Sequence, residues 1–144
     1  MAAIVSNNTE HGRLIAEAIP RCYNPSTDAV ISHVDKTGEL LGGVIYDGFT
    51  GNCVFMHQAG FSKLWLSRAM LWAVFDFPFN VMGVAKVAGT IPSSNETLLE
   101  FNKKLGFKEE ARIKDAYKNG DMIVLTMSRE ECRWLSPLKV THER

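Results

Sequence analysis

Residues 95–127, NETLLEFNKKLGFKEEARIKDAYKNGDMIVLTM, carry the strongest structural signal in this chain. Leu98, Phe101 and Leu105 recur at helical spacing, which predicts an amphipathic helix over 96–104 that Gly106 ends. Two strand-like runs follow, over 108–117 and 122–127, and the Asn-Gly pair between them is typical of a type I′ turn. The segment therefore predicts a helix followed by a β-hairpin.

The residues before this segment alternate between short strands and helices. Strands are expected over 2–6, 30–35, 40–46, 53–59 and 84–91, and helices over 11–19 and 62–75. Ser62 is the expected N-cap of the second helix. Gly42 and Gly43 indicate a bulge or a close backbone approach in their strand. The resulting order is strand, helix, three-strand meander, long helix, strand, helix and hairpin.

Length and charge limit the protein class. The 144 residues predict one domain over 1–136, with a frayed tail over 137–144. Sixteen basic and sixteen acidic residues balance, so broad nucleic-acid binding is not expected. The most apolar stretch, 64–79, is interrupted by charged residues and a proline, so it predicts a buried helix and no membrane span.

Cysteine usage and the N-terminus point to a cytoplasmic protein. Three cysteines lie far apart without a CxxC pair, so neither a disulfide framework nor a metal site is expected. The N-terminus lacks a basic region followed by an apolar run, and we therefore expect no signal peptide.

The segment 95–127, together with the element order, resembles the GNAT superfamily of N-acyltransferases. The closing residues 127–135, MSREECRWL, also resemble small N-acetyltransferase-like proteins, including ones encoded by tailed bacteriophages. The resemblance implies an α/β (α+β) mixed sheet, mostly antiparallel, with a central splayed parallel pair formed by 53–59 and 84–91. Acetyl-CoA would be the co-substrate, and a phage-encoded member would work in the host cytoplasm.

In this family the pantetheine lies between the splayed strands, and the pyrophosphate sits at the N-terminus of the following helix. The usual loop pattern is Gln or Arg, two residues, Gly, one residue, then Gly or Ala. Here Ser62, Trp65 and Ser67 take those positions, so Trp65 either blocks the close approach to the phosphates or points into the core. The alternative is an ordinary capped core helix. The candidate cofactor-binding residues are Gly60, Ser62, Lys63, Trp65, Ser67, Arg68, Asn95 and Asn102.

The candidate catalytic residue is His57, whose ordinary pKa suits a general base acting on an ammonium. The alternative is a structural histidine on the strand, and Asp47 and Glu110 are weaker candidates. Asn102 stands where many family members have the tyrosine that protonates the thiolate, and an amide cannot do so. Asn102 is alternatively a solvated helix residue, and Asn95 is a helix N-cap, a cofactor contact or both.

Two functions follow from the resemblance. The first is transfer of an acetyl group from acetyl-CoA to an unidentified amine, on a small molecule or a protein, by direct attack. The second is a catalytically inactive GNAT-like phage protein that binds a host or virion protein. An exposed part of the aromatic segment 65–79 would mark such a partner surface or a homodimer interface.

Overall fold

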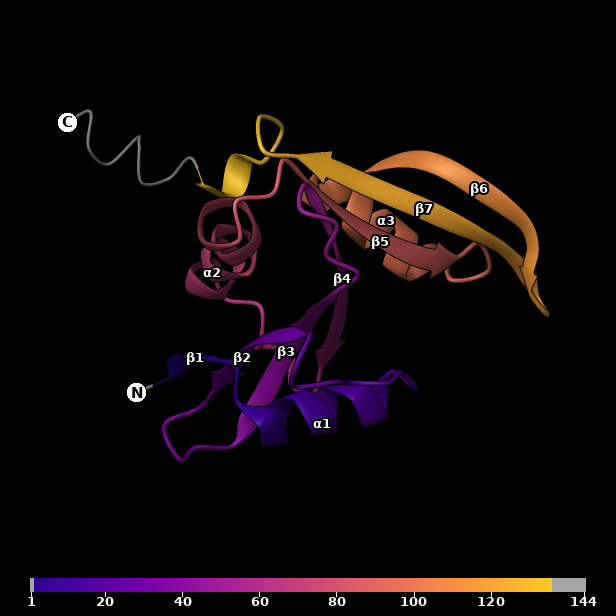
Figure 1. Ribbon diagram of the computed structural model, residues 1–144. Helices are drawn as coiled ribbons and strands as arrows, with labels where there is room; N and C mark the ends of the chain where they lie inside the picture. The colour runs from indigo at the N-terminus through magenta and orange to yellow at the C-terminus, as the bar shows by residue number, and fades with distance from the viewer. Residues whose placement is uncertain (1, 136–144) are drawn as a thin grey trace.

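The computed structural model describes residues 2–135, and the tail predicted over 137–144 lies outside this range. Seven strands form one sheet in the order β1-β2-β3-β4-β5-β7-β6 (Figure 1). The strands are β1 (Ala3–Ser6), β2 (Ala29–Val34), β3 (Leu40–Asp47), β4 (Cys53–Gly60), β5 (Lys86–Pro92), β6 (Lys108–Tyr117) and β7 (Gly120–Ser128). The helices are α1 (Thr9–Ala18), α2 (Arg68–Asp76) and α3 (Glu96–Leu105), with a π-helical turn at Phe77–Val81 and a 3-10 turn at Arg133–Leu135. The predicted order of elements is confirmed.

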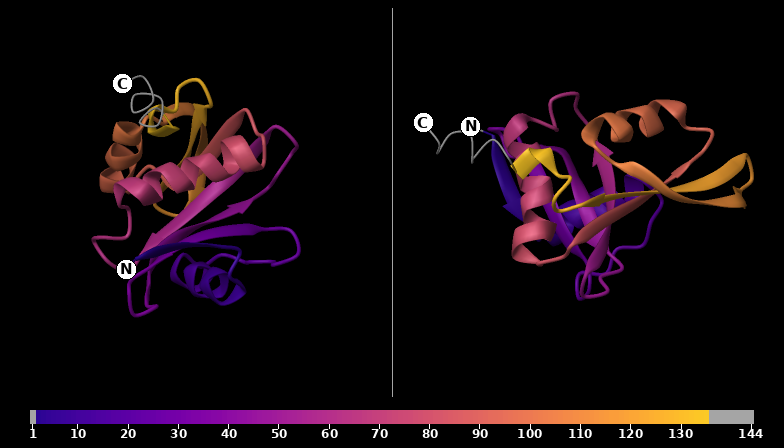
Figure 2. Two further views of the ribbon diagram at one scale, coloured as in Figure 1. Left: turned by 90° about the vertical axis from the view of Figure 1, so that its left-hand side faces the viewer. Right: turned by 90° about the horizontal axis from the view of Figure 1, so that it is seen from above.

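Helices cover both faces of the sheet (Figures 1 and 2). On one face α1 buries Ile15 against Val30 and Ile45 of β2 and β3. On the other face α2, α3 and the two short turns bury the larger core, which includes Phe75 and Phe79. The β6–β7 hairpin projects from the body (Figure 2, right), and β6 is largely exposed along its length. No helix within residues 2–135 is long and apolar enough to span a membrane.

β4 and β5 are the only parallel neighbours among the described strands, and they pair over a short distance. The register joins Cys53 to Lys86 and ends with Phe55 opposite Ala88. Each strand stays paired on its other side, β4 with β3 as far as Gly60 and β5 with β7 through Pro92. The two strands therefore separate beyond Phe55 while the rest of the sheet remains closed. This confirms the expected mixed sheet with a central splayed parallel pair.

The long helix begins six residues later than the sequence predicts. Ser67, and not Ser62, is its N-cap, and its hydroxyl accepts a hydrogen bond from Met70 N–H at 3.1 Å. The carbonyl of Trp65 accepts a hydrogen bond from His33 Nδ1 at 2.7 Å, which withdraws it from helical pairing. Ser62 instead closes a turn by accepting from Leu64 N–H. Residues 62–67 are consequently a loop between β4 and α2.

The C-terminal end of α2 runs directly into a second helical segment. Pro78 does not stop the helical chain, which continues as a π-helical turn to Val81. Pro78 has no N–H for the carbonyl four residues earlier, that of Val74. The buried Tyr46 hydroxyl donates to this carbonyl at 2.6 Å. A side chain from β3 thus completes the hydrogen bonding of the helix.

The turn of the β6–β7 hairpin differs from the predicted Asn-Gly type I′ turn. Tyr117 pairs with Gly120, so Lys118 and Asn119 form the turn. The residue of this hairpin in the left-handed conformation is Asp115, with φ of 57°, at an irregularity in β6. A Cβ at Gly120 would lie 2.6 Å from the Ser93 hydroxyl. Glycine is needed there for a tertiary contact and not for a positive φ.

Candidate active site

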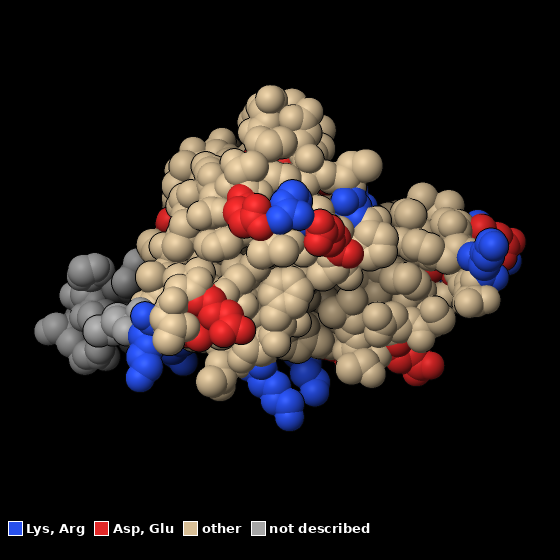
Figure 3. Space-filling view, turned by 90° about the horizontal axis from the view of Figure 1, so that it is seen from below, with Lys and Arg blue, Asp and Glu red and all other residues tan. Residues whose placement is uncertain are grey.

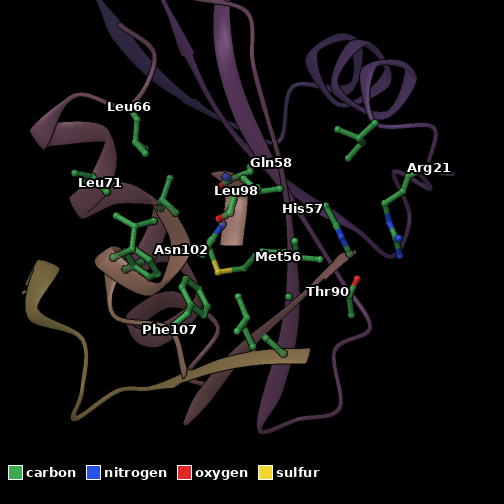
Figure 4. A pocket seen from close by; sticks show the side chains of 18 of the residues that line it. Arg21, Met56, His57, Gln58, Leu66, Leu71, Thr90, Leu98, Asn102 and Phe107 are labelled. Atoms are coloured by element: carbon green, nitrogen blue, oxygen red, sulfur yellow. The ribbon is translucent and has the colours of Figure 1, made fainter. Parts of the chain in front are cut away.

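The separation of β4 and β5 opens a hollow of about 360 Å³ in the middle of the sheet (Figure 4). Figure 4 shows His57, Thr90 and Arg21 on one side of this hollow and Leu98, Asn102 and Phe107 on the other. The residues that line it come from both splayed strands, from α2 and α3, and from the segment after α1. We call this the strand-gap hollow. Its size is at the lower end of the range for small-molecule sites.

The free edge of β4 presents unpaired main-chain groups to this hollow. Phe61 N–H donates to Leu41 O at 2.8 Å, so odd-numbered residues of this chain segment face β3. Even-numbered residues therefore turn their N–H and C=O groups toward β5, and the Met56 carbonyl indeed faces Gly89. The parallel register ends with Phe55 opposite Ala88, a pairing in which Met56 N–H donates to Ala88 O, so Gln58 carries the first N–H group on the open edge. This group can pair with an extended ligand.

His57 lies in the strand-gap hollow and forms a hydrogen bond with Asp47. The distance between His57 Nε2 and Asp47 Oδ1 is 2.7 Å, and the histidine side chain is 9% exposed. The other Asp47 oxygen, Oδ2, is 3.3 Å from Nη2 of Arg21, a residue that also lines the hollow. Arg21 thus positions Asp47, and Asp47 positions the histidine of β4.

This arrangement sets the protonation of His57. Burial lowers the pKa of His57 below its ordinary value, while the hydrogen bond with Asp47 acts in the opposite direction and does not cancel the effect. A carboxylate only accepts hydrogen bonds, so the neutral ring carries its proton on Nε2. Nδ1 is then free to accept a proton, and the ring is neutral at pH 7. His57 has the properties of a general base.

A second, more open groove adjoins the strand-gap hollow. Both spaces are lined by Gln58, Leu66 and Leu71, so they are continuous. The groove runs between the 62–67 loop and the C-terminal half of α3, and we call it the basic groove. Its exposed cations are Lys63, Lys104 and Arg133. They come from three separate parts of the chain and give the groove the charge that a phosphate group needs.

Aromatic contacts fix one wall of the basic groove. The Arg133 guanidinium lies 4.4 Å from the ring centroid of Trp134, and it donates to the carbonyl of Lys104. Trp134 Nε1 donates to the carbonyl of Leu105 at 2.8 Å. The residues after β7 are thereby attached to the last turn of α3. This wall is held by contacts that the element order does not reveal.

Trp65 lies against the sheet. A Cβ at Gly60 would meet Trp65 Nε1 at 2.3 Å, and one at Gly42 would meet Cγ of the same ring at 2.7 Å. The indole therefore covers two glycines of β3 and β4 and packs against the larger core. Of the two alternatives that the sequence left open, the structure shows the inward orientation. The tryptophan also supplies part of the groove lining.

The remaining predicted site residues separate into two groups. Gly60, Ser62 and Lys63 line the basic groove together with Trp65, and Asn102 lines the strand-gap hollow. Asn102 is half-buried and donates to Leu98 O at 2.9 Å, so it is not the solvated helix residue that one of the two interpretations expected.

The second group has capping or surface positions. Ser67 caps α2, and Asn95 caps α3 by accepting from Leu98 N–H at 3.2 Å; neither lines either space. Arg68 is exposed and Glu110 bonds to Thr126, both outside the two spaces.

Several lining residues were missed by reasoning from the sequence. Arg21 and Tyr117 line the strand-gap hollow, and Lys104 and Arg133 line the basic groove. Arg21 reaches Asp47 across 26 positions, and no local pattern signals such a contact. The three basic residues of the groove likewise show no common spacing. Within residues 2–135, no group of three His, Cys, Asp or Glu side chains comes together as metal ligands.

No family model matches the chain, and no curated protein matches its sequence. Solved structures of spermidine/spermine N-acetyltransferase SpeG from Vibrio cholerae are similar in fold. The SpeG complex with manganese ions has a TM-score of 0.74 at 11% identity, covering 94% of this chain and 96% of that chain. A point mutant of the same enzyme has a TM-score of 0.75 at 11% identity, covering 93% and 96%. A second mutant structure gives 0.66 at 12% identity over 77% and 70%. The chain therefore has the GNAT fold that the sequence resemblance implied.

Proposed function

We propose that this protein is an acetyl-CoA-dependent N-acetyltransferase that acts on an amine. The observation that carries the proposal is the strand-gap hollow, where the Gln58 N–H on the open edge of β4 and the base-like His57 share one space. The basic groove continues from this space, so an extended acyl thioester with a phosphorylated end fits the two together. The GNAT fold of the neighbours supports the same function.

The residues of the hollow supply three parts of the reaction. The Gln58 N–H is placed to pair with the pantetheine arm or to polarise a thioester carbonyl. His57 Nδ1 takes a proton from the ammonium, either directly or through water, and Asp47 stabilises the imidazolium that forms. The amine nitrogen then attacks the carbonyl carbon, forming the C–N bond as the C–S bond breaks, and the nitrogen gives its second proton to solvent to leave the neutral amide.

Asn102 is placed to assist departure of the thiolate without protonating it. One of its amide hydrogens is used by Leu98 O, which leaves the second hydrogen free for the hollow that this residue lines. A thiol has a pKa near 8.5, so a thiolate is a stable leaving group near neutral pH. Solvent then supplies the proton.

Calorimetric titration of the protein with acetyl-CoA tests the proposal. We expect saturable binding, and Lys63→Glu is expected to weaken it about tenfold because this charge lines the basic groove. Lys36→Glu, in the exposed β2–β3 turn, is the matched charge control and is expected to bind as the wild type does. Added salt should reduce the difference between the two variants.

Two results would refute the proposal. Absence of binding at millimolar acetyl-CoA would exclude the enzyme, and it would support the inactive, protein-binding phage protein instead. Equal loss of affinity in the Lys63 and Lys36 variants would show that the basic groove is not the binding site.

A further inference from the structure

We propose that the acceptor is a small primary amine with one positive charge and an apolar body, and not a polyamine. The inference rests on the proposed function and concerns the same hollow. It starts from the charges around His57, the residue that would receive the proton of the amine. The solved structures of similar fold belong to a spermidine/spermine N-acetyltransferase, so the inference separates this chain from its structural neighbours.

The lining of the strand-gap hollow is predominantly apolar. Its residues on the α1 side of the sheet include Ile19 and Pro20, which follow α1, and the carbon atoms of Thr90 on β5. Among the described residues, no aspartate or glutamate lines this hollow. A body of hydrocarbon or aromatic character would therefore replace water there at little cost.

The carboxylates nearest to His57 are already engaged. Asp47 contacts both His57 and Arg21. Asp28 accepts hydrogen bonds from Asn24 N–H at 2.9 Å and from the Thr27 hydroxyl at 3.0 Å. Neither carboxylate is therefore free to bind a second ammonium group of the ligand.

A polyamine would need more carboxylates along its length than this site offers. Asp47 is shared between His57 and Arg21, at 2.7 and 3.3 Å. Arg21 is 42% exposed and lines the hollow, so a second cation of the ligand would meet a positive charge there. Seen from the side of α1, acidic and basic groups are interspersed over the surface (Figure 3). This distribution gives weak long-range attraction to a polycation.

The test is a comparison of acceptors by mass spectrometry of the acetylated products. Phenethylamine, spermidine and a lysine-containing peptide are each incubated with the protein and acetyl-CoA. We expect kcat/KM for phenethylamine to exceed that for spermidine by at least about tenfold, because the extra cations find no carboxylate. A preference for spermidine or for the peptide would overturn the inference, and so would the absence of phenethylamine turnover.

A charge-reversal variant tests the cause of the preference. Arg21→Glu places a free carboxylate at the hollow, and it should raise spermidine kcat/KM relative to phenethylamine by about tenfold. Arg13→Glu makes the same change on the outer face of α1, where Arg13 pairs with Glu10 and Glu17, and it should leave the ratio unchanged.

The possible outcomes also separate this inference from the proposed function. An equal change in both would show that net charge, and not the site, controls the ratio. Wild-type binding of acetyl-CoA with spermidine as the better acceptor would overturn the inference alone, whereas loss of acetyl-CoA binding would overturn the proposed function.

Discussion

Gly89→Val is expected to weaken acetyl-CoA binding without unfolding the protein. Gly89 lies on β5 and lines the strand-gap hollow. A Cβ at this position would have one neighbour within 4 Å, the Met56 carbonyl oxygen at 3.6 Å, which is an ordinary van der Waals distance. A β-carbon therefore fits at this position in the unliganded protein. The valine side chain would occupy the space between β4 and β5 that we assign to the pantetheine.

The size of the effect follows from this geometry. Overpacking a fitted space costs about 1–3 kcal/mol, so the Kd for acetyl-CoA should rise about 5- to 150-fold. The free energy of unfolding should not fall, because replacing glycine restricts the unfolded chain by about 0.4–1 kcal/mol. Calorimetric titration measures the Kd, and urea denaturation measures the free energy of unfolding.

Ala111→Val is the matched control for Gly89→Val. It adds a branched side chain on β6, where residue 111 is exposed and outside the hollow. It should change neither the Kd for acetyl-CoA nor the free energy of unfolding appreciably. Wild-type affinity in Gly89→Val would refute the assignment of the β4–β5 gap. Unfolding of Gly89→Val would show instead that the gap is closed by packing in the free protein.

Three further predictions concern the base and the core. His57→Gln should lower kcat/KM by about 10²–10⁴-fold, and a normal rate would exclude His57 as the base. Because burial lowers the pKa of His57 and the neutral ring is the active form, kcat/KM should fall on the acid side with a midpoint below pH 6.5; a midpoint above 6.5 would contradict this assignment. Tyr46→Phe should lower the free energy of unfolding by about 1–3 kcal/mol in urea denaturation, since Pro78 offers no N–H to replace the hydroxyl at Val74 O. An unchanged stability would show that this carbonyl finds another partner.

The sequence predicts the order of elements because that order depends on local patterns. Leu98 and Leu105 recur at helical spacing, and the predicted α3 agrees with the structure. The paired glycines of β3 were correctly interpreted as a close approach: a Cβ at Gly43 would lie 2.7 Å from Ile15 Cδ1, and Gly42 is covered by Trp65. The splayed pair is confirmed as well, although it was inferred from the resemblance and not from the strand residues alone.

The errors arise where a distant residue changes local structure. The start of α2 depends on His33, which lies 32 positions from the Trp65 carbonyl that it binds. The hairpin turn depends on Ser93, which approaches Gly120 from the loop before α3. Arg21 enters the candidate site through a comparable long-range contact. A single sequence contains no signal for such pairs, because each partner is unremarkable among its own neighbours.

A crystal structure of the protein with coenzyme A would test the central claim most directly. We predict that the thiol end lies between β4 and β5, beside the Gln58 N–H, and that the phosphates lie in the basic groove near Lys63. Coenzyme A bound elsewhere, or an empty gap at saturating ligand with β4 and β5 closed by side chains, would contradict the proposed function.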